Sequence, residues 1–319
     1  MKRLHTYRMA LACFVSLALA FSACGHEADE AHFSAPPYAP PLFSPHRSDT
    51  TLRILVIGNS YAENATEMIP LLLDGAEISV YDGCCLYVAA IGSASLKLWY
   101  NYYKADSVVH CNKVIEEAGI RSEGTLTELF AQPWDIISFQ QYSIQSTDYA
   151  TFHPFLDSLV ACARRLCTNP EVSIAWHQTW SHDNNSERMY ERIVNASARL
   201  YADGLVDLLI PSGTAIQNAR QTSLNTSHNL TRDGTHLTYA AGLYVAACTW
   251  FETLFMPVFE KSVLGNTAVR RATDREKQAS PYETVDVTPE NSELYQRCAV
   301  AAVANPFGIT FIEDTYTAL

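Results

Sequence analysis

The chain has 319 residues, of which 48% are hydrophobic and 18% are charged, and its formal net charge is -12 at pH 7. This is the composition of an acidic globular protein that is long enough to bury a sizeable core. Because a nucleic-acid-binding surface needs clustered basic residues, the acidic balance excludes nucleic acid as the expected partner.

The amino terminus predicts export from the cytoplasm. An apolar run over residues 9–23 is too short to span a membrane as a helix. Basic residues precede this run at Lys2, Arg3 and Arg8. A positively charged start followed by a short apolar stretch is typical of a signal peptide, which we assign to residues 1–23.

Residues 21–24, Phe-Ser-Ala-Cys, have the small-residue pattern of a bacterial lipobox. In such a motif the cysteine is lipidated and becomes the first residue of the mature chain. We therefore expect a lipoprotein that is anchored in the membrane through Cys24 and faces the periplasm or the cell surface. The alternative is a soluble secreted protein in which Cys24 has no such role.

Residues 24–50 are rich in proline and have no amphipathic period, so we expect an extended tether there. Residues 51–319 are expected to form a single domain. Within it, the polar stretch 261–289 predicts a solvated helix or loop, and the apolar spacing over 291–305 predicts a C-terminal helix that packs back on the domain.

From Thr51 onward, strand-like and helix-like segments alternate. The first strand is expected at 53–57 and the second at 78–81 or 85–90; three more are expected at 134–139, 172–176 and 207–211. Helical patterns over 152–167 and 186–201 separate the last three. This alternation predicts an α/β fold with a parallel, doubly wound sheet. In such sheets, ligands bind outside the carboxyl ends of the strands.

Seven cysteines follow Cys24, and their spacing contains no C-x-x-C pair and no zinc framework. An odd number cannot all pair within one chain. Exported chains can hold disulfides, so the sequence leaves both free thiols and one or two bridges open.

Ser60 is the candidate nucleophile. It follows the first expected strand by three residues, in a Gly58-Asn59-Ser60 turn that leads into a helix. The free N–H groups at a helix start favour a developing anion. A serine at such a position more commonly caps the helix, so Ser60 alone is a weak signal.

Candidate oxyanion donors follow two other expected strands. Gly92 comes after a β-like run, where a backbone N–H could approach a substrate oxygen, although a plain turn is the preferred explanation for Gly92 taken alone. Gln140 and Gln141 end the strand at 134–139, and strand alternation sends their side chains to opposite faces. At least one of the two amides is therefore expected to point at the cleft and to stabilise an oxyanion.

Asp233 and His236 lie three residues apart, just before a long apolar run. At this spacing the carboxylate can reach one imidazole nitrogen while the other faces a serine from another strand end. A neutral histidine held in this way is a competent base near pH 7. Together with Ser60, these residues make the inventory of a serine hydrolase.

In these motifs the chain resembles the SGNH (GDSL-like) hydrolase superfamily, in particular its bacterial lipoproteins with Gly-Asn-Ser in the first block. The similarity extends over residues 53–255. Ser60 matches the nucleophile, Gly92 the oxyanion glycine, and Asp233 and His236 the final Asp-x-x-His. The third block departs from the family's Gly-x-Asn-Asp, so we assign its amide role to Gln140 or Gln141.

The resemblance implies a three-layer α/β/α sandwich with a flavodoxin-like sheet, ester hydrolysis through an acyl-enzyme, and neither metal nor cofactor. Exported members often remove acetyl groups from sugars, so the expected substrate is an acylated carbohydrate or a small ester. We expect further substrate contacts from residues beside the nucleophile and at the end of the fourth strand: Asn59, Tyr61, His177 and Trp180.

Three alternatives remain open from the sequence. A carbohydrate-binding lipoprotein would keep the fold without turnover, and an acyltransferase would use the same triad with a sugar in place of water. A metallohydrolase would use the histidines His177, His182, His228 and His236, but the zinc-binding spacings of such enzymes are absent from the sequence.

Overall fold

The computed structural model describes residues 33–39, 51–80, 84–226 and 228–314. The signal peptide, Cys24 and much of the expected tether lie outside these residues, so their assignments stay predictions. Among the described helices, none is both long and apolar enough to cross a membrane.

A seven-stranded sheet forms the centre of the domain, in the order β4-β3-β2-β1-β5-β6-β7. The strands are β1 (Leu52–Gly58), β2 (Cys84–Ala90), β3 (Val108–Ile115), β4 (Glu123–Thr125), β5 (Ile136–Phe139), β6 (Ser173–His177) and β7 (Leu208–Ile210). The run from β2 through β1, β5 and β6 to β7 is parallel. Its reversal of strand order around β1 is that of a doubly wound α/β fold, which confirms the predicted fold class.

Two strands at one edge correct the expectation of a purely parallel sheet. β3 pairs antiparallel with β2, and β4 pairs antiparallel with β3. Most of β3 is exposed or half-buried, because its residues His110, Asn112 and Lys113 face solvent at the sheet edge. A strand with so few buried apolar residues lacks the continuous run that marks the central strands.

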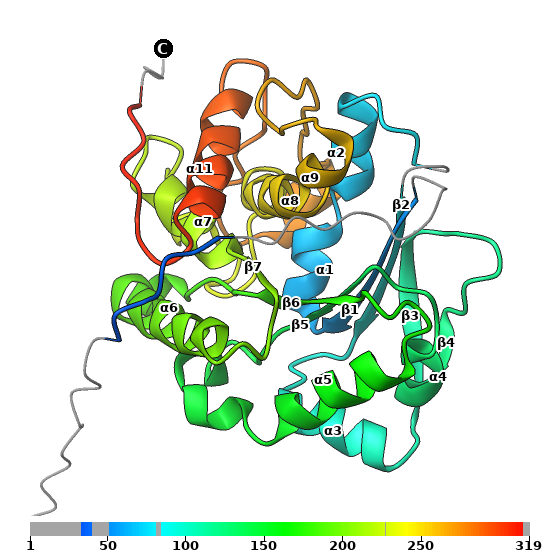
Figure 1. Cartoon of the computed structure of the whole chain (residues 1–319). Helices are drawn as coiled ribbons and strands as arrows, with labels where there is room; N and C mark the ends of the chain where they lie inside the picture. Colours follow the sequence, from blue (N-terminus) through cyan, green and yellow to red (C-terminus); the bar gives the residue numbers. More distant parts are fainter. Residues whose placement is uncertain (1–32, 40–50, 81–83, 227, 315–319) are drawn as a thin grey trace, which may run out of the picture. The chain divides into compact units, whose positions relative to one another are not determined.

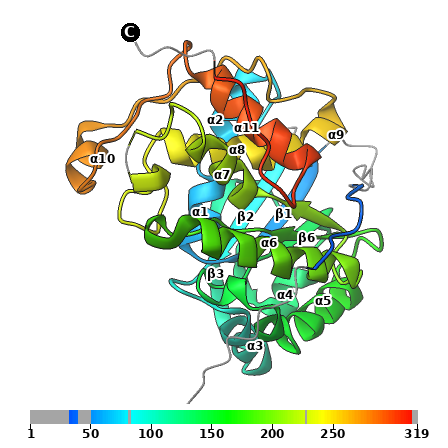
Figure 2. The ribbon, with the colours of Figure 1, turned by 90° about the vertical axis from the view of Figure 1, so that its left-hand side faces the viewer.

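Helices cover both faces of the sheet, as Figures 1 and 2 show. One layer contains α1 (Ser60–Thr66), α2 (Ile69–Gly75), α7 (Ser212–Arg220), α8 (Ala241–Leu254), α9 (Met256–Phe259) and α11 (Ser292–Ala304). The opposite layer contains α3 (Leu96–Lys104), α4 (Leu126–Phe130), α5 (Phe155–Leu166) and α6 (Ser186–Ala202). A short helix, α10 (Asp274–Ala279), lies outside the layers (Figure 2), and 3-10 turns occur at Gln145–Thr147, Tyr149–Phe152, Asp183–Asn185 and His228–Leu230.

Strand β1 divides the core in two. Ile54 and Val56 pack with the α1–α8–α11 layer, while Leu55 and Ile57 pack with the opposite layer. Every residue of β1 is buried because helices cover both faces. The predicted C-terminal helix is present as α11, which packs against α7 and α8.

Part of the segment expected to be a tether lies against the domain. The Tyr38 hydroxyl donates to the Leu209 carbonyl at 3.2 Å and accepts from its N–H at 3.1 Å. The guanidinium of Arg199 lies 5.7 Å from the centre of the Phe33 ring. Residues 33–39 are thus held by aromatic side chains, and burial raises the pKa of Tyr38 to about 12.

The sequence left both free thiols and disulfide bridges open, and the cysteines buried in the core are free thiols. Cys84, Cys85, Cys162 and Cys248 are buried and free. Burial raises the pKa of the Cys84 and Cys248 thiols well above the ordinary range, so these groups behave as small apolar core residues.

Candidate active site

Polar loops meet at the carboxyl ends of the parallel strands. Ser60 begins α1 directly after β1, Ser93 follows β2, Ser143 follows β5 and His182 follows β6. These residues line one pocket of about 110 Å³, together with Asn59, Tyr61, Tyr142, Thr235 and His236. The doubly wound topology therefore gathers at one edge the side chains that the sequence keeps far apart.

The turn before Ser60 depends on its first two residues. A Cβ atom at Gly58 would lie 2.7 Å from the Ala62 Cβ and 3.0 Å from the Gln140 side chain, so only glycine fits there. Asn59 caps α1, because its Oδ1 accepts from the Tyr61 N–H at 3.0 Å. Its Nδ2 donates to the Ala94 carbonyl at 3.1 Å, which ties the first turn to the loop after β2.

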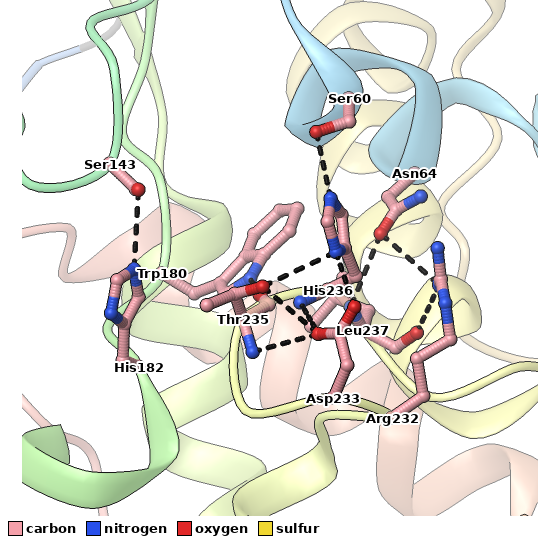
Figure 3. Close-up of polar contacts among 10 residues, drawn as sticks. All are labelled: Ser60, Asn64, Ser143, Trp180, His182, Arg232, Asp233, Thr235, His236 and Leu237. Carbon is pink, nitrogen blue, oxygen red and sulfur yellow. Dashed lines mark hydrogen bonds and ion pairs between the residues drawn. The ribbon is translucent and has the colours of Figure 1, made fainter. Parts of the chain in front are cut away.

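Ser60, His236 and Asp233 form a continuous hydrogen-bonded chain (Figure 3). His236 Nε2 lies 2.9 Å from Ser60 Oγ, and His236 Nδ1 lies 2.6 Å from Asp233 Oδ2. A carboxylate only accepts, so Nδ1 carries the proton and donates to Asp233. The lone pair on Nε2 then faces the serine hydroxyl, as a base requires.

The Asp233 carboxylate is fixed by its own loop. Its Oδ1 accepts from the Thr235 N–H at 3.0 Å, the Thr235 hydroxyl at 2.9 Å and the His236 N–H at 2.7 Å. Burial alone would raise its pKa, but the hydrogen bonds from His236 and Thr235 outweigh burial and hold the pKa of Asp233 well below its ordinary value. The tight turn passes through Gly234, whose φ of +86° suits glycine.

Asn64 connects the helix of the serine to the loop of the histidine. Its Oδ1 accepts from the Leu237 N–H at 3.2 Å and from Arg232 Nη1 at 3.4 Å. Arg232 Nη1 also donates to the Leu237 carbonyl at 2.6 Å, and its guanidinium lies 4.5 Å from the centre of the Tyr239 ring. Figure 3 shows Asn64 between these groups.

The expected glutamine donors do not line the pocket. Gln140 is 1% exposed; its Nε2 donates to Asn59 Oδ1 at 2.7 Å, and its Oε1 lies 2.9 Å from His177 Nδ1. Gln141 is equally buried, and its Nε2 donates to the Thr151 carbonyl and hydroxyl. Strand alternation predicted that at least one amide would point at the cleft, but both amides bond to other residues behind the site. This corrects their assignment to the oxyanion hole.

The loop after β2 reaches the pocket through Ser93. Gly92 is exposed, and a Cβ atom there would meet nothing within 4 Å. Ser93 has a φ of +57°, a conformation that a serine adopts only when its surroundings impose it. Gly92 itself is not part of the pocket lining, but it directly precedes Ser93, which is.

Of the four expected substrate contacts, two line the pocket and two do not. Asn59 and Tyr61 are in the lining. Trp180 is fully buried, stacks on Tyr61 at 4.2 Å between ring centroids and donates to the Thr235 carbonyl at 2.8 Å. His177 is buried behind Gln140, and burial lowers its pKa to about 3. Trp180 and His177 therefore support the wall from behind, which corrects their assignment to substrate.

Other pocket residues had no assigned role in the sequence interpretation. Ser143 Oγ lies 3.2 Å from His182 Nε2. Thr235 contacts Asp233, and Tyr142 lies next to Ser143 in the chain. The position of Ser143 two residues beyond Gln141 was the available signal, but a serine in a loop is too common to single out.

Arg220 braces the loops beneath the pocket. Its Nη1 donates to the Ser181 hydroxyl at 2.7 Å, and its Nη2 donates to the Ser181 carbonyl at 2.9 Å. Its Nε donates to the Asn229 carbonyl at 2.8 Å. Burial lowers the pKa of Arg220 to about 10, which leaves the guanidinium charged near neutral pH.

Comparison with known proteins gives a family for this chain. A family model described as a domain of unknown function, DUF4886, matches residues 53–283. The crystal structure of a DUF4886 family protein from Bacteroides uniformis is 29% identical with a TM-score of 0.66, and the match covers 82% of this chain and 97% of that chain. No curated protein matches the chain.

Two solved structures are more distant. TesA is 12% identical with a TM-score of 0.41, over 65% of this chain and 98% of that chain. BT4096, described as a gut microbial diltiazem-metabolizing enzyme, is 11% identical with a TM-score of 0.41, over 68% of this chain and 49% of that chain.

Proposed function

The chain belongs to the DUF4886 family, and we propose that it is a serine esterase in which Ser60, His236 and Asp233 form the catalytic triad. The observation that carries the proposal is the unbroken chain from Ser60 Oγ through His236 to Asp233, with two contacts of 2.9 and 2.6 Å, at the wall of a pocket. The resemblance of the same residues to the SGNH hydrolase blocks supports it.

The reaction begins with proton transfer inside the triad. His236 Nε2 takes the proton of Ser60 Oγ while Oγ attacks the ester carbonyl carbon. Asp233 stabilises the resulting imidazolium through its 2.6 Å contact with Nδ1. The imidazolium then protonates the leaving alcohol oxygen, and an acyl-enzyme remains on Ser60. Water repeats these steps with His236 as base, which releases the acid and restores Ser60.

Backbone N–H groups are the first candidates for holding the oxyanion. Ser60 is the first residue of α1, where an N–H has no partner within the helix. The Gly92 N–H is the second donor in this proposal, because Gly92 directly precedes Ser93 of the pocket lining. Because Gln140 and Gln141 bond elsewhere, neither amide is included.

The shape of the pocket favours a short acyl group. Its volume of about 110 Å³ is well below the roughly 300–1,000 Å³ of sites that enclose a drug-sized ligand. The rest of the substrate must then stay outside the pocket. Hydroxyl-bearing residues make up much of the lining, namely Ser60, Tyr61, Ser93, Tyr142, Ser143 and Thr235. An acetylated carbohydrate, with a small acyl group on a large polar body, fits this arrangement.

The cellular setting remains part of the proposal. With a lipobox at Cys24, the enzyme would be anchored outside the cytoplasm, where a surface lipoprotein would meet polysaccharide first. Membrane attachment through this lipid and an acylated sugar are the partners that we propose.

Acetate release tests the proposal. The full-length protein is incubated with a chromogenic acetyl ester and with acetylated polysaccharides, alongside Ser60→Ala and the control Ser223→Ala, which changes an exposed serine away from the pocket. We expect release by the wild type and the control, and background release by Ser60→Ala. A chelator should leave the rate unchanged. A phosphonate probe should label Ser60.

Three outcomes would contradict the triad or ester hydrolysis. If Ser60→Ala released acetate at the wild-type rate, the triad would be wrong. If the wild type bound acetylated sugar without releasing acetate and without phosphonate labelling, the carbohydrate-binding alternative would replace the esterase. Transfer of the acetyl group to an added sugar in preference to water would identify an acyltransferase.

A further inference from the structure

A second hydroxyl–imidazole pair lies in the same pocket as the first. Ser143 Oγ and His182 Nε2 are 3.2 Å apart, and both residues line the pocket with Ser60 and His236. Figure 3 shows the two pairs on different sides of the site. In the described part of the chain, no carboxylate is hydrogen-bonded to His182. The second pair thus lacks a carboxylate like Asp233, which orients His236 through Nδ1, and a different role suits it.

The sequence interpretation expected a side-chain oxyanion donor from the loop after β5. The two amides expected there are engaged elsewhere, Gln140 with Asn59 and Gln141 with Thr151. Ser143, two residues beyond Gln141, does line the pocket. A hydroxyl has one proton to donate and two lone pairs to accept, so Ser143 can accept from His182 and still donate to a substrate oxygen.

We propose that the Ser143 hydroxyl donates a hydrogen bond to the oxyanion of the tetrahedral intermediate, while His182 Nε2–H donates to Ser143 Oγ and directs the hydroxyl proton towards the substrate. The proposal rests on the esterase function above. It involves no proton transfer and no bond made or broken at Ser143. The chain of two hydrogen bonds strengthens the donor, because each bond polarises the next.

The surrounding contacts hold this pair in place. The Ser143 carbonyl accepts from the Ser146 hydroxyl at 2.5 Å, and Ser146 Oγ accepts from the Thr179 hydroxyl at 3.3 Å. The loop after β5 is therefore bonded to the loop after β6, which also carries His182. Donors fixed in advance stabilise a developing charge without reorganisation.

The charge state of His182 agrees with this role. Partial burial lowers the pKa of His182, and Arg220 and His236 act in the same direction against Asp183 and Asp233. The imidazole is thus neutral at working pH and has a single N–H. Ser143 is also close enough to the Tyr61 hydroxyl to lower the pKa of Tyr61, although burial raises that pKa overall. Tyr61 is consequently the competing donor that the test must separate.

The test is a comparison of kcat and KM for the full-length protein on a chromogenic acetyl ester. We expect Ser143→Ala to lower kcat by about 100-fold, as for the loss of one oxyanion donor, with KM little changed. Ser143→Thr keeps the hydroxyl and should keep most of the activity. Ser143→Cys, nearly isosteric but a weaker donor, should lie between. His182→Gln keeps an N–H near the Nε2 position and should lose less than His182→Leu.

Different results separate this proposal from the esterase itself. Thermal melting of each variant, with Ser223→Ala as control, shows whether a loss comes from unfolding. A kcat for Ser143→Ala within threefold of the wild type, with activity still abolished in Ser60→Ala, would overturn the role of Ser143 alone. A large loss in Tyr61→Phe with full activity in Ser143→Ala would assign the donor to Tyr61. Failure of the wild type to hydrolyse any ester would overturn both proposals.

Discussion

Asn64 accepts a hydrogen bond from the Leu237 N–H at 3.2 Å, so the helix that begins with Ser60 is bonded directly to the loop that carries His236. Ser60 and His236 are 176 residues apart in the chain. A distance of 2.9 Å between Ser60 Oγ and His236 Nε2 therefore depends on contacts that fix α1 against this loop.

Replacement of Asn64 by leucine should weaken both stability and turnover. Asn64 is 6% exposed, and its loss would leave the buried Leu237 N–H without this acceptor. An unsatisfied buried donor costs about 1–3 kcal/mol, which denaturant unfolding would measure. We expect kcat to fall together with the stability, because the loop that carries His236 is no longer bonded to α1 through this contact. Asn64→Asp keeps an acceptor oxygen and is the matched control; equal losses in both variants would contradict this role of the hydrogen bond.

Asp233→Asn should lower kcat strongly with little change in KM. An amide in place of the carboxylate can offer an N–H to His236 Nδ1, which would move the imidazole proton to Nε2 and face a donor towards Ser60. The equivalent change in trypsin costs about 10⁴-fold. Steady-state kinetics on an acetyl ester measure the effect. Asp233→Glu keeps the charge and is the control, and a kcat for Asp233→Asn near that of the wild type would argue against Asp233 as the orienting group.

The central strands were predictable because each is a largely continuous run of apolar residues. Residues 54–57 are an apolar run with three β-branched side chains, as a strand covered on both faces requires, and the structure has β1 at Leu52–Gly58. β3 was missed because its exposed polar residues, such as Asn112 and Lys113, interrupt any apolar run. Its antiparallel pairing to β2 has no local signal that a sequence could carry.

The candidate site also contains residues that the sequence could predict and residues that it could not. Spacing alone placed Asp233 within reach of His236, because three residues in a tight turn leave few geometries. Gln140 could not be assigned correctly, since its partners Asn59 and His177 are distant in sequence and occupy both ends of its amide. Trp180 was expected to contact the substrate, yet a large aromatic beside the site gains more by burial against Tyr61.

Gly58→Ala should destabilise the fold and reduce activity. The added Cβ would lie 2.7 Å from the Ala62 Cβ and 3.0 Å from Gln140, so α1 or the loop after β5 must move. Overpacking of this kind costs roughly 1–3 kcal/mol, and denaturant unfolding measures it. Gly204→Ala is an unsuitable control because Gly204 has a φ of +68°. Gly92→Ala meets no atom within 4 Å, so we expect its stability to equal that of the wild type.

His177 should make the stability of the protein depend on pH between about 6.5 and 3. Burial lowers the pKa of His177 from 6.5 to about 3, so below pH 6.5 the unfolded chain binds a proton that the folded protein does not. The free energy of unfolding contributed by this group then falls as pH falls, by up to about 1.4 kcal/mol per pH unit.

The neutral ring has its proton on Nδ1, because Gln140 Oε1 at 2.9 Å is an acceptor. In His177→Asn an amide N–H can replace this donor without a titrating group, so the wild type should lose stability relative to this variant on acidification. Denaturant unfolding of both at pH 7, 6, 5 and 4.5 measures the difference, and His177→Leu, which leaves Gln140 without this donor, should be less stable than His177→Asn at every pH. A difference between the wild type and His177→Asn that stays constant from pH 7 to 4.5 would show that His177 is not held neutral in the fold.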